Sequence, residues 1–212
     1  MNQRPVMLVG FQNQGNLGLG YLAAVLRRHG YPVQVVDIEQ DPEEILRVAI
    51  ELKPVLIGFS LIFQFFIDQY AALLYLLRKN GIDAHFTMGG HFPSLSYEQT
   101  LELIPELDSV VRFEGETTLI ELVDAIVTGT DWRAVHGIAY RDEDGIRLTK
   151  PRALLEDSKA WRPRVWENGH FLWGDKNGLW QNPALPFCRH GSQAPRNLRG
   201  RGHFPDGTYQ GP

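Results

Sequence analysis

The sequence predicts an α/β fold: a doubly wound, flavodoxin-like sheet of five parallel strands with helices on both faces. Apolar runs of five or six residues recur through the first 130 residues without the alternation of half-exposed strands. Segments of helical period separate these runs, as in a parallel sheet with crossover helices. Glycine-containing loops follow three of the runs. The strand order that we expect is 2-1-3-4-5.

The first two strand–helix units are well marked. The strand Val6–Gly10 precedes a helix at Leu17–His29, and Gly30 provides a stop for this helix. The second strand, Val33–Ile38, is followed by Asp41-Pro42, an N-cap residue and a first-turn proline that favour a helix through Leu52.

Three further units complete the expected sheet. Each strand is apolar enough to be buried on both faces, and each helix ends near a glycine, a proline or a polar residue. The strands are Val55–Ser60, Ile82–Met88 and Ser109–Arg112, and the helices run from about Phe65 to Asn80, from about Tyr97 to Ile104, and over Thr117–Thr128. The segments Val135–Tyr140 and Gly145–Thr149 then flank an Asp-Gly turn, which is typical of a β-hairpin.

Composition excludes several classes of protein. The net charge of -4 and the pI near 6.0 give no basic field, so we expect no nucleic-acid partner. The first apolar run is six residues long, too short for a signal peptide or a membrane span, which predicts a cytoplasmic protein without membrane association. The single cysteine, Cys188, excludes an internal disulfide and an iron–sulfur cluster held by three or four cysteines of this chain.

The predicted ligand site lies where the parallel strands end. Glycine-rich or polar loops follow the first, third and fourth strands, at Gly15–Gly20, Gly58–Ile62 and Thr87–Ser94. Ligands on doubly wound sheets bind outside the carboxyl ends of the strands, at the switch point. Neither Gly89 nor Gly90 carries a Cβ, so the backbone can approach a flat or phosphorylated ligand closely.

Five motifs together resemble the N-terminal cobalamin-binding domain of cobalamin-dependent radical-SAM proteins, over about residues 5–157. They are LGLGYLAAxLRxxGY at Leu17–Tyr31, the acidic strand end at Asp37, GFSLxFQ at Gly58–Gln64, GGHFPS at Gly89–Ser94, and RFEGETTLxEL at Arg112–Leu122.

The resemblance implies a corrinoid-binding module of a methyltransferase or cyclase. Gly89 and Gly90 would open a slot for the nucleotide tail of cobalamin, Ser60 would offer a hydroxyl to the tail or its phosphate, and the loop at 12–18 would cover the lower face of the corrin. The implied cofactor-binding residues are Asn13, Gln14, Gly15, Asn16, Leu17, Gly18, Asp37, Ser60, Leu61, Phe63, Gln64, Gly89, Gly90, His91, Phe92, Pro93, Glu114 and Gly115.

The first loop departs from the pattern of other cobalamin domains. Those domains carry DxHxxG, whose histidine coordinates cobalt, but the matching segment Asn13–Gly18 has glycine at the histidine position. The resemblance therefore implies base-off cobalamin without a histidine lower ligand. Of the other histidines, we expect His91 to contact the corrin rim and not to bind metal.

The resemblance also implies three regions. Residues 1–130 would form the cobalamin-binding domain, and residues 131–157 a hairpin and linker toward a radical-SAM catalytic domain that this chain lacks. Residues 158–212 hold four of the five tryptophans and no periodicity, which predicts an irregular, solvated or out-of-frame tail. Because the radical step needs a CxxxCxxC run, we expect no complete catalytic cycle, and no catalytic residue, in this chain alone.

Two other functions fit parts of the pattern less well. A dinucleotide-binding domain would explain Asp37, about twenty residues beyond the glycine loop, but the loop has GxxGxG spacing in place of GxGxxG. A receiver-like interaction domain needs acidic residues where Gln12 and Ser60 stand. Locally, Gly89-Gly90 is also typical of a tight turn, and helix N-terminal electrostatics explains Glu114 and Glu116 without catalysis.

Overall fold

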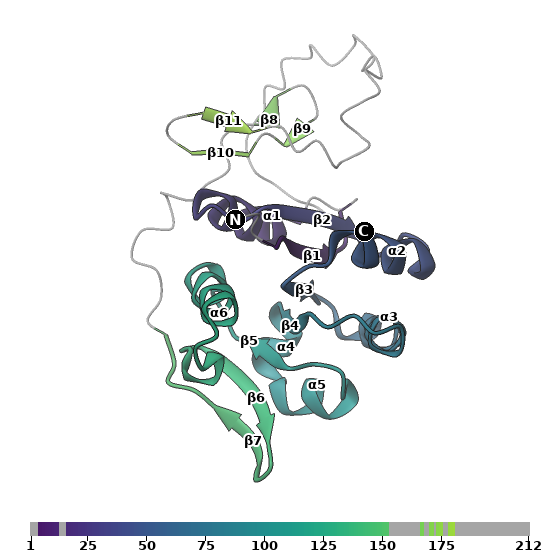
Figure 1. The fold of residues 1–212 in the computed structure, drawn as a ribbon, viewed down its shortest axis with the longest axis vertical. Coiled ribbons are helices and arrows are strands. Elements are labelled where there is room, and N and C mark those ends of the chain that lie inside the picture. The colour runs from purple at the N-terminus through teal and green to yellow at the C-terminus, as the bar shows by residue number, and fades with distance from the viewer. Residues whose placement is uncertain are drawn as a thin grey trace, which may run out of the picture.

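The computed structural model describes residues 4–12 and 16–152, together with the backbone of four short strands between 166 and 180. A seven-stranded sheet in the order β2-β1-β3-β4-β5-β6-β7 forms the centre of the molecule (Figure 1). Its strands are β1 (Val6–Gly10), β2 (Val33–Asp37), β3 (Leu56–Ser60), β4 (His85–Gly89), β5 (Ser109–Val111), β6 (Ile138–Asp142) and β7 (Gly145–Leu148). The first five pair in parallel, which confirms the predicted strand order.

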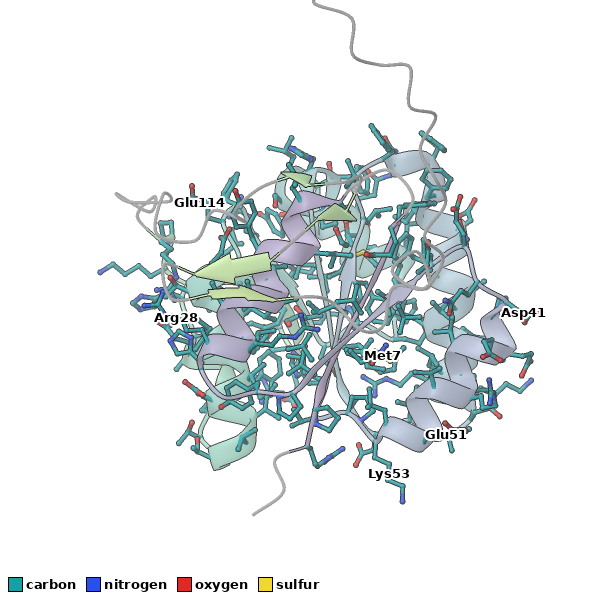
Figure 2. The ribbon with its side chains drawn as sticks, turned by 90° about the horizontal axis from the view of Figure 1, so that it is seen from above. Met7, Arg28, Asp41, Glu51, Lys53 and Glu114 are labelled. Atoms are coloured by element: carbon teal, nitrogen blue, oxygen red, sulfur yellow. The ribbon has the colours of Figure 1, made fainter. Side chains whose placement is uncertain are left out.

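Helices cover both faces of this sheet. Helices α1 (Leu17–Arg28) and α6 (Glu116–Thr128) share one buried cluster with β1 and β5, on the left of the sheet in Figure 1. The other cluster contains side chains from α2 (Pro42–Leu52), α3 (Ile67–Lys79) and α5 (Tyr97–Leu103). Figure 2 shows Met7 of β1 well inside the molecule, while Asp41, Glu51 and Lys53 lie around α2 at its periphery. The doubly wound arrangement is therefore present.

Local hydrogen bonds explain where two helices begin. Asp41 Oδ1 accepts a hydrogen bond from Glu43 N at 2.9 Å, and Pro42 occupies the first turn, where its missing N–H costs nothing. Asn16 Oδ1 accepts from Leu19 N at 3.1 Å and so caps α1. Both helix starts are therefore encoded in short polar segments of the sequence.

The sheet has seven strands, where the sequence predicted five plus a separate hairpin. The hairpin β6–β7 pairs antiparallel with β5, with Val111 opposite Ile138. Strand β5 has only three residues, and without the hairpin one of its edges would be unpaired. The hairpin pairs with this edge and covers it. The fourth strand begins at His85, later than the predicted Ile82.

Short helical segments occur in the connections, and one of them, at Gln64–Phe66, overlaps the predicted start of the third helix at about Phe65. Helix α4 (His91–Leu95) follows Gly90 directly, and the 3₁₀ helices η1 (Gln64–Phe66) and η2 (Trp132–Ala134) precede α3 and β6. Beyond residue 152, β8 (Trp166–Glu167) pairs with β9 (His170–Phe171), and β10 (Trp173–Asp175) pairs with β11 (Gly178–Trp180). The remaining residues of the predicted tail, Cys188 among them, lie outside the described residues. Within the described part, no helix is both long and apolar enough to cross a bilayer.

Candidate functional site

A cavity of about 260 Å³ lies between the sheet and helices α1 and α6, toward the carboxyl ends of the strands. This volume is close to the roughly 300 Å³ at which small-molecule pockets begin. Most of its wall is aliphatic, aromatic or glycine, with a few polar side chains. The lining residues are Leu8, Leu19, Leu22, Phe59, Val111, Phe113 and Leu119; the glycines at 18, 58, 89, 90 and 115; and Ser60, Thr87, Glu114 and Glu116.

The double glycine at the end of β4, Gly89 and Gly90, keeps this cavity open. Gly90 has φ +122°, and a Cβ there would overlap the carbonyl oxygen of Leu61, so only glycine fits. A Cβ on Gly89 would meet Val111 O at an ordinary 3.5 Å, and would take up space in the cavity. Leu61 N donates to Gly89 O at 2.9 Å, which joins the ends of β3 and β4. Glycine is thus required at position 90 by the backbone conformation, and glycine at position 89 leaves space open in the cavity.

The hydroxyls in the cavity wall already have protein partners. Ser60 Oγ accepts from Asn16 Nδ2 at 3.5 Å, while the hydroxyl of Tyr70 donates to Ser60 O at 2.6 Å. Burial raises the pKa of Tyr70 above its ordinary value, so this donor stays protonated into the alkaline range as well. Thr87 Oγ1 accepts from Ser109 Oγ at 2.8 Å. These bonds hold the side chains at fixed places in the wall.

The loop between β5 and α6 forms one side of the cavity mouth. Phe113 has φ +60°, which is rare for a residue other than glycine, and the residue is 60% exposed. Ser94 of α4 holds this backbone, because Phe113 N donates to Ser94 Oγ at 2.8 Å and Arg112 Nε donates to Ser94 O at 3.1 Å. The motifs GGHFPS and RFEGET therefore meet at the cavity through Ser94.

Glu116, the first residue of α6, differs from the other polar residues of the wall. Its Oε2 is buried, and no donor among the described residues reaches it. Leaving a buried acceptor without a hydrogen bond costs free energy, and this cost is larger for an ionised carboxylate than for a neutral group. A ligand that enters the cavity with a hydrogen-bond donor would satisfy this oxygen.

Six of the sequence-predicted site residues line the cavity: Gly18, Ser60, Gly89, Gly90, Glu114 and Gly115. Asn16 reaches it indirectly through Ser60. Leu17 lies exposed at the start of α1, and Asn13, Gln14 and Gly15 lie outside the described residues.

The other predicted residues do not line the cavity. Asp37 ends β2, and its Oδ1 accepts from Glu39 N at 3.1 Å in the following turn. Leu61 and Pro93 are buried, and Phe92 packs against the core. Phe63, Gln64 and His91 are exposed in the segments that follow β3 and β4.

The implied cofactor-binding residues did not include Thr87, Leu22, Phe113 or Glu116, although Thr87 begins one of the three predicted site loops. Thr87 could have been found from strand alternation, because residues two apart share a face and Gly89 had been singled out. Glu116 stands in the RFEGET motif but was explained by helix electrostatics. Within the described residues, no group of three histidine, cysteine, aspartate or glutamate side chains could hold a metal ion.

Comparison with known proteins agrees with this geometry. Residues 4–123 match the family model described as B12 binding domain. The chain belongs to the B12-binding domain family. Accordingly, neither the dinucleotide-binding nor the receiver-like alternative is favoured.

Relatives with curated names include methyltransferases. An uncharacterized methyltransferase of Pyrococcus horikoshii, PH0819, is 28% identical over 144 residues, covering 66% of this chain and 31% of the relative. Cytidylyl-2-hydroxyethylphosphonate methyltransferase of Streptomyces wedmorensis is 31% identical over 177 residues, covering 72% of this chain and 32% of that relative. This chain thus spans about a third of the length of these relatives.

Solved structures of cobalamin-dependent radical-SAM enzymes have the same fold. OxsB with aqua-cobalamin and S-adenosylmethionine bound is 26% identical with a TM-score of 0.63, covering 72% of this chain and 23% of that one. The methyltransferase TsrM from Kitasatospora setae is 24% identical with a TM-score of 0.63, covering 71% of this chain and 31% of TsrM. The domain described here matches the cobalamin-binding modules of this class of enzyme.

The residues present fit a corrinoid. Its nucleotide tail ends in a flat aromatic base, which needs a narrow apolar slot, and its corrin ring needs an open edge above that slot. The aliphatic walls and the glycines at 58, 89 and 90 provide the slot, and the unpaired Glu116 oxygen provides an acceptor for a polar group inside it.

Proposed function

We propose that this chain binds cobalamin in the base-off form, with the nucleotide tail inserted into the cavity between the sheet and helices α1 and α6. The observation that carries this proposal is the glycine-edged cavity at the carboxyl ends of β3 and β4. The apolar walls would exclude water from the aromatic base, and Ser60 would face the sugar and phosphate part of the tail.

The corrin ring would rest on the sheet edge above Gly89 and Gly90. Phe113 and the segment at 63–64 present exposed groups near this edge, and His91 follows the double glycine directly. No histidine occurs between Gln12 and Gly18, the loop that would lie beneath the ring. Cobalt would therefore have no histidine from this loop as its lower ligand.

The partner that we propose is a radical-SAM catalytic domain, because TsrM and OxsB are radical S-adenosylmethionine enzymes and this chain covers only 31% and 23% of them. When bound, a cobalamin without a strong lower ligand supplies an electron-rich cobalt suited to methyl transfer. This chain's own residues would hold the cofactor and leave the upper face of the ring open to that partner.

The proposal is tested by titrating the purified protein with hydroxocobalamin and methylcobalamin, followed by desalting. Retention of one corrinoid per chain with a base-off visible spectrum is expected. A folded protein that loses all colour on desalting would rule the proposal out. A protein that retains cobalamin with a base-on spectrum would rule out insertion of the nucleotide tail into the cavity.

A further inference from the structure

Glu116 is set apart from the other polar side chains that line the cavity. Ser60 Oγ and Thr87 Oγ1 already accept hydrogen bonds from Asn16 and Ser109, and Glu114 also has an interaction partner. Glu116 Oε2 is buried, lies in the wall and accepts nothing from the described residues. An unmet acceptor is therefore built into the apolar wall.

The position of Glu116 explains part of this arrangement. It begins α6, where the helix dipole favours a carboxylate, but a dipole does not replace the missing donor to a buried oxygen. The neighbouring wall residues Leu22, Leu119 and Val111 cannot donate hydrogen bonds through their side chains. Among the described residues no donor reaches Glu116 Oε2, so a ligand in the cavity that carries a donor would satisfy this oxygen.

We infer that Glu116 recognises the aromatic base at the end of the corrinoid tail. In base-off cobalamin the ring nitrogen of this base does not coordinate cobalt, and Glu116 shares a proton with that nitrogen. This inference rests on the proposed function. The corrin amides remain at the rim, so the base is the part of the ligand that reaches the wall beside α6. The proton is taken up from solvent when the ligand binds and forms one N–H or O–H bond between the two partners; no other covalent bond forms or breaks. Glu116 thereby selects corrinoids whose lower base carries such a nitrogen.

Three corrinoids separate this role from general binding. Cobalamin has a benzimidazole nitrogen, p-cresolylcobamide has an aromatic lower base without a ring nitrogen, and cobinamide has no nucleotide. Dissociation constants are measured by visible absorbance for the wild type and for Glu116→Leu. We expect the variant to bind cobalamin at least tenfold more weakly and the other two corrinoids within twofold of the wild type.

A matched control comes from the same helix. Glu121 binds Arg152 through both carboxylate oxygens and does not line the cavity. Glu121→Leu should leave all three dissociation constants within twofold. The thermal stability of ligand-free Glu116→Leu should equal or exceed that of the wild type, because the substitution removes an unpaired buried acceptor. If Glu116→Leu fails to fold, the milder Glu116→Ala is measured in its place.

An equal loss of affinity for all three corrinoids, or no loss for cobalamin, would overturn the inference. A folded wild-type protein that binds none of the three would overturn the proposed function itself, and the inference with it. The two failures are thus distinguishable from the wild-type measurement alone.

Discussion

At the scale of single residues, the adjacent glycines at 89 and 90 serve different purposes. Gly89 can accept a methyl group sterically, since a Cβ would stand 3.5 Å from Val111 O, but that methyl would occupy the cavity. At Gly90, the positive φ and the Leu61 carbonyl oxygen leave no room for a Cβ. Substitution at the two positions should therefore separate binding from folding.

We predict that Gly89→Ala weakens cobalamin binding about tenfold with little change in stability, because overfilling a packed site costs about 1–3 kcal/mol. Gly90→Ala should instead lower the free energy of unfolding by about 2–4 kcal/mol. Absorbance titration and urea denaturation of both variants check this. Equal destabilisation by the two substitutions would contradict the division of roles.

His85 gives a prediction for pH. Burial lowers its pKa to about 4, with nearby Arg78 and Arg133 acting in the same direction and Asp108 against it. Its Nε2 lies 2.9 Å from Ser109 Oγ. Between pH 6.5 and about 4 the unfolded chain binds a proton at this histidine that the folded chain does not, so stability falls as pH falls through that window.

His85→Gln should flatten this loss, because glutamine does not titrate. The measurement is the free energy of unfolding in urea from pH 7 to pH 4.5, for the wild type and the variant. Carboxylates that titrate in the same window cancel in the difference between the two. Parallel pH profiles would show that His85 is not the group responsible.

At the scale of elements, the short helix α4 supports the cavity mouth. Ser94 is buried, and its Oγ accepts from Phe113 N at 2.8 Å, where the backbone has φ +60°. Ser94→Ala should cost about 1–3 kcal/mol of stability, because it leaves a backbone donor unpaired. It should also weaken cobalamin binding, because the β5–α6 loop is released.

The control for this prediction is Ser96→Ala. Ser96 precedes α5, and its side chain makes no capping hydrogen bond. We expect this variant to stay within about 0.5 kcal/mol of the wild type, because Ser96 is only half-buried and its side chain makes no capping hydrogen bond. Thermal denaturation and absorbance titration compare the two variants. If Ser94→Ala behaves like Ser96→Ala, α4 does not support the loop.

Strands and glycine loops could be predicted because they depend on local sequence. Buried parallel strands are apolar throughout, and their carboxyl ends share one edge, so the amino-acid pattern alone places the regions around Ser60 and Gly89 together. Helix α4 could not be predicted in this way, because Gly90 and Pro93 are typical of a turn. Pro93 fits this helix because it lies in its first turn, where no N–H is needed.

Two features of the site depend on packing that the sequence does not encode locally. Whether Glu116 Oε2 finds a donor depends on how α6 packs against β5 and α1, elements far apart in the chain. Likewise, the segments at 135–149 predict a hairpin, but their pairing with β5 follows from the exposed edge of the assembled sheet.

At the scale of the whole molecule, the two buried clusters draw their residues from 6–139. Arg152 closes this region, since its guanidinium binds Glu121 and its Nε donates to Thr118 Oγ1 at 3.1 Å. We therefore predict that a chain ending at Lys159, which keeps these contacts, folds and binds cobalamin with the affinity of the full chain, within about threefold. Thermal denaturation and absorbance titration test this, and loss of binding by a folded short chain would assign part of the site to later residues.

A crystal structure of the cobalamin complex, with anomalous data collected at the cobalt edge, would locate both the cobalt and the nucleotide tail. We predict a cobalt peak above Gly89 and Gly90, with density for the lower base between Leu22, Leu119 and Glu116. A cobalt peak elsewhere, or a base that remains coordinated to cobalt while the cavity stays empty of ligand, would show that the nucleotide tail does not bind between the sheet and helices α1 and α6.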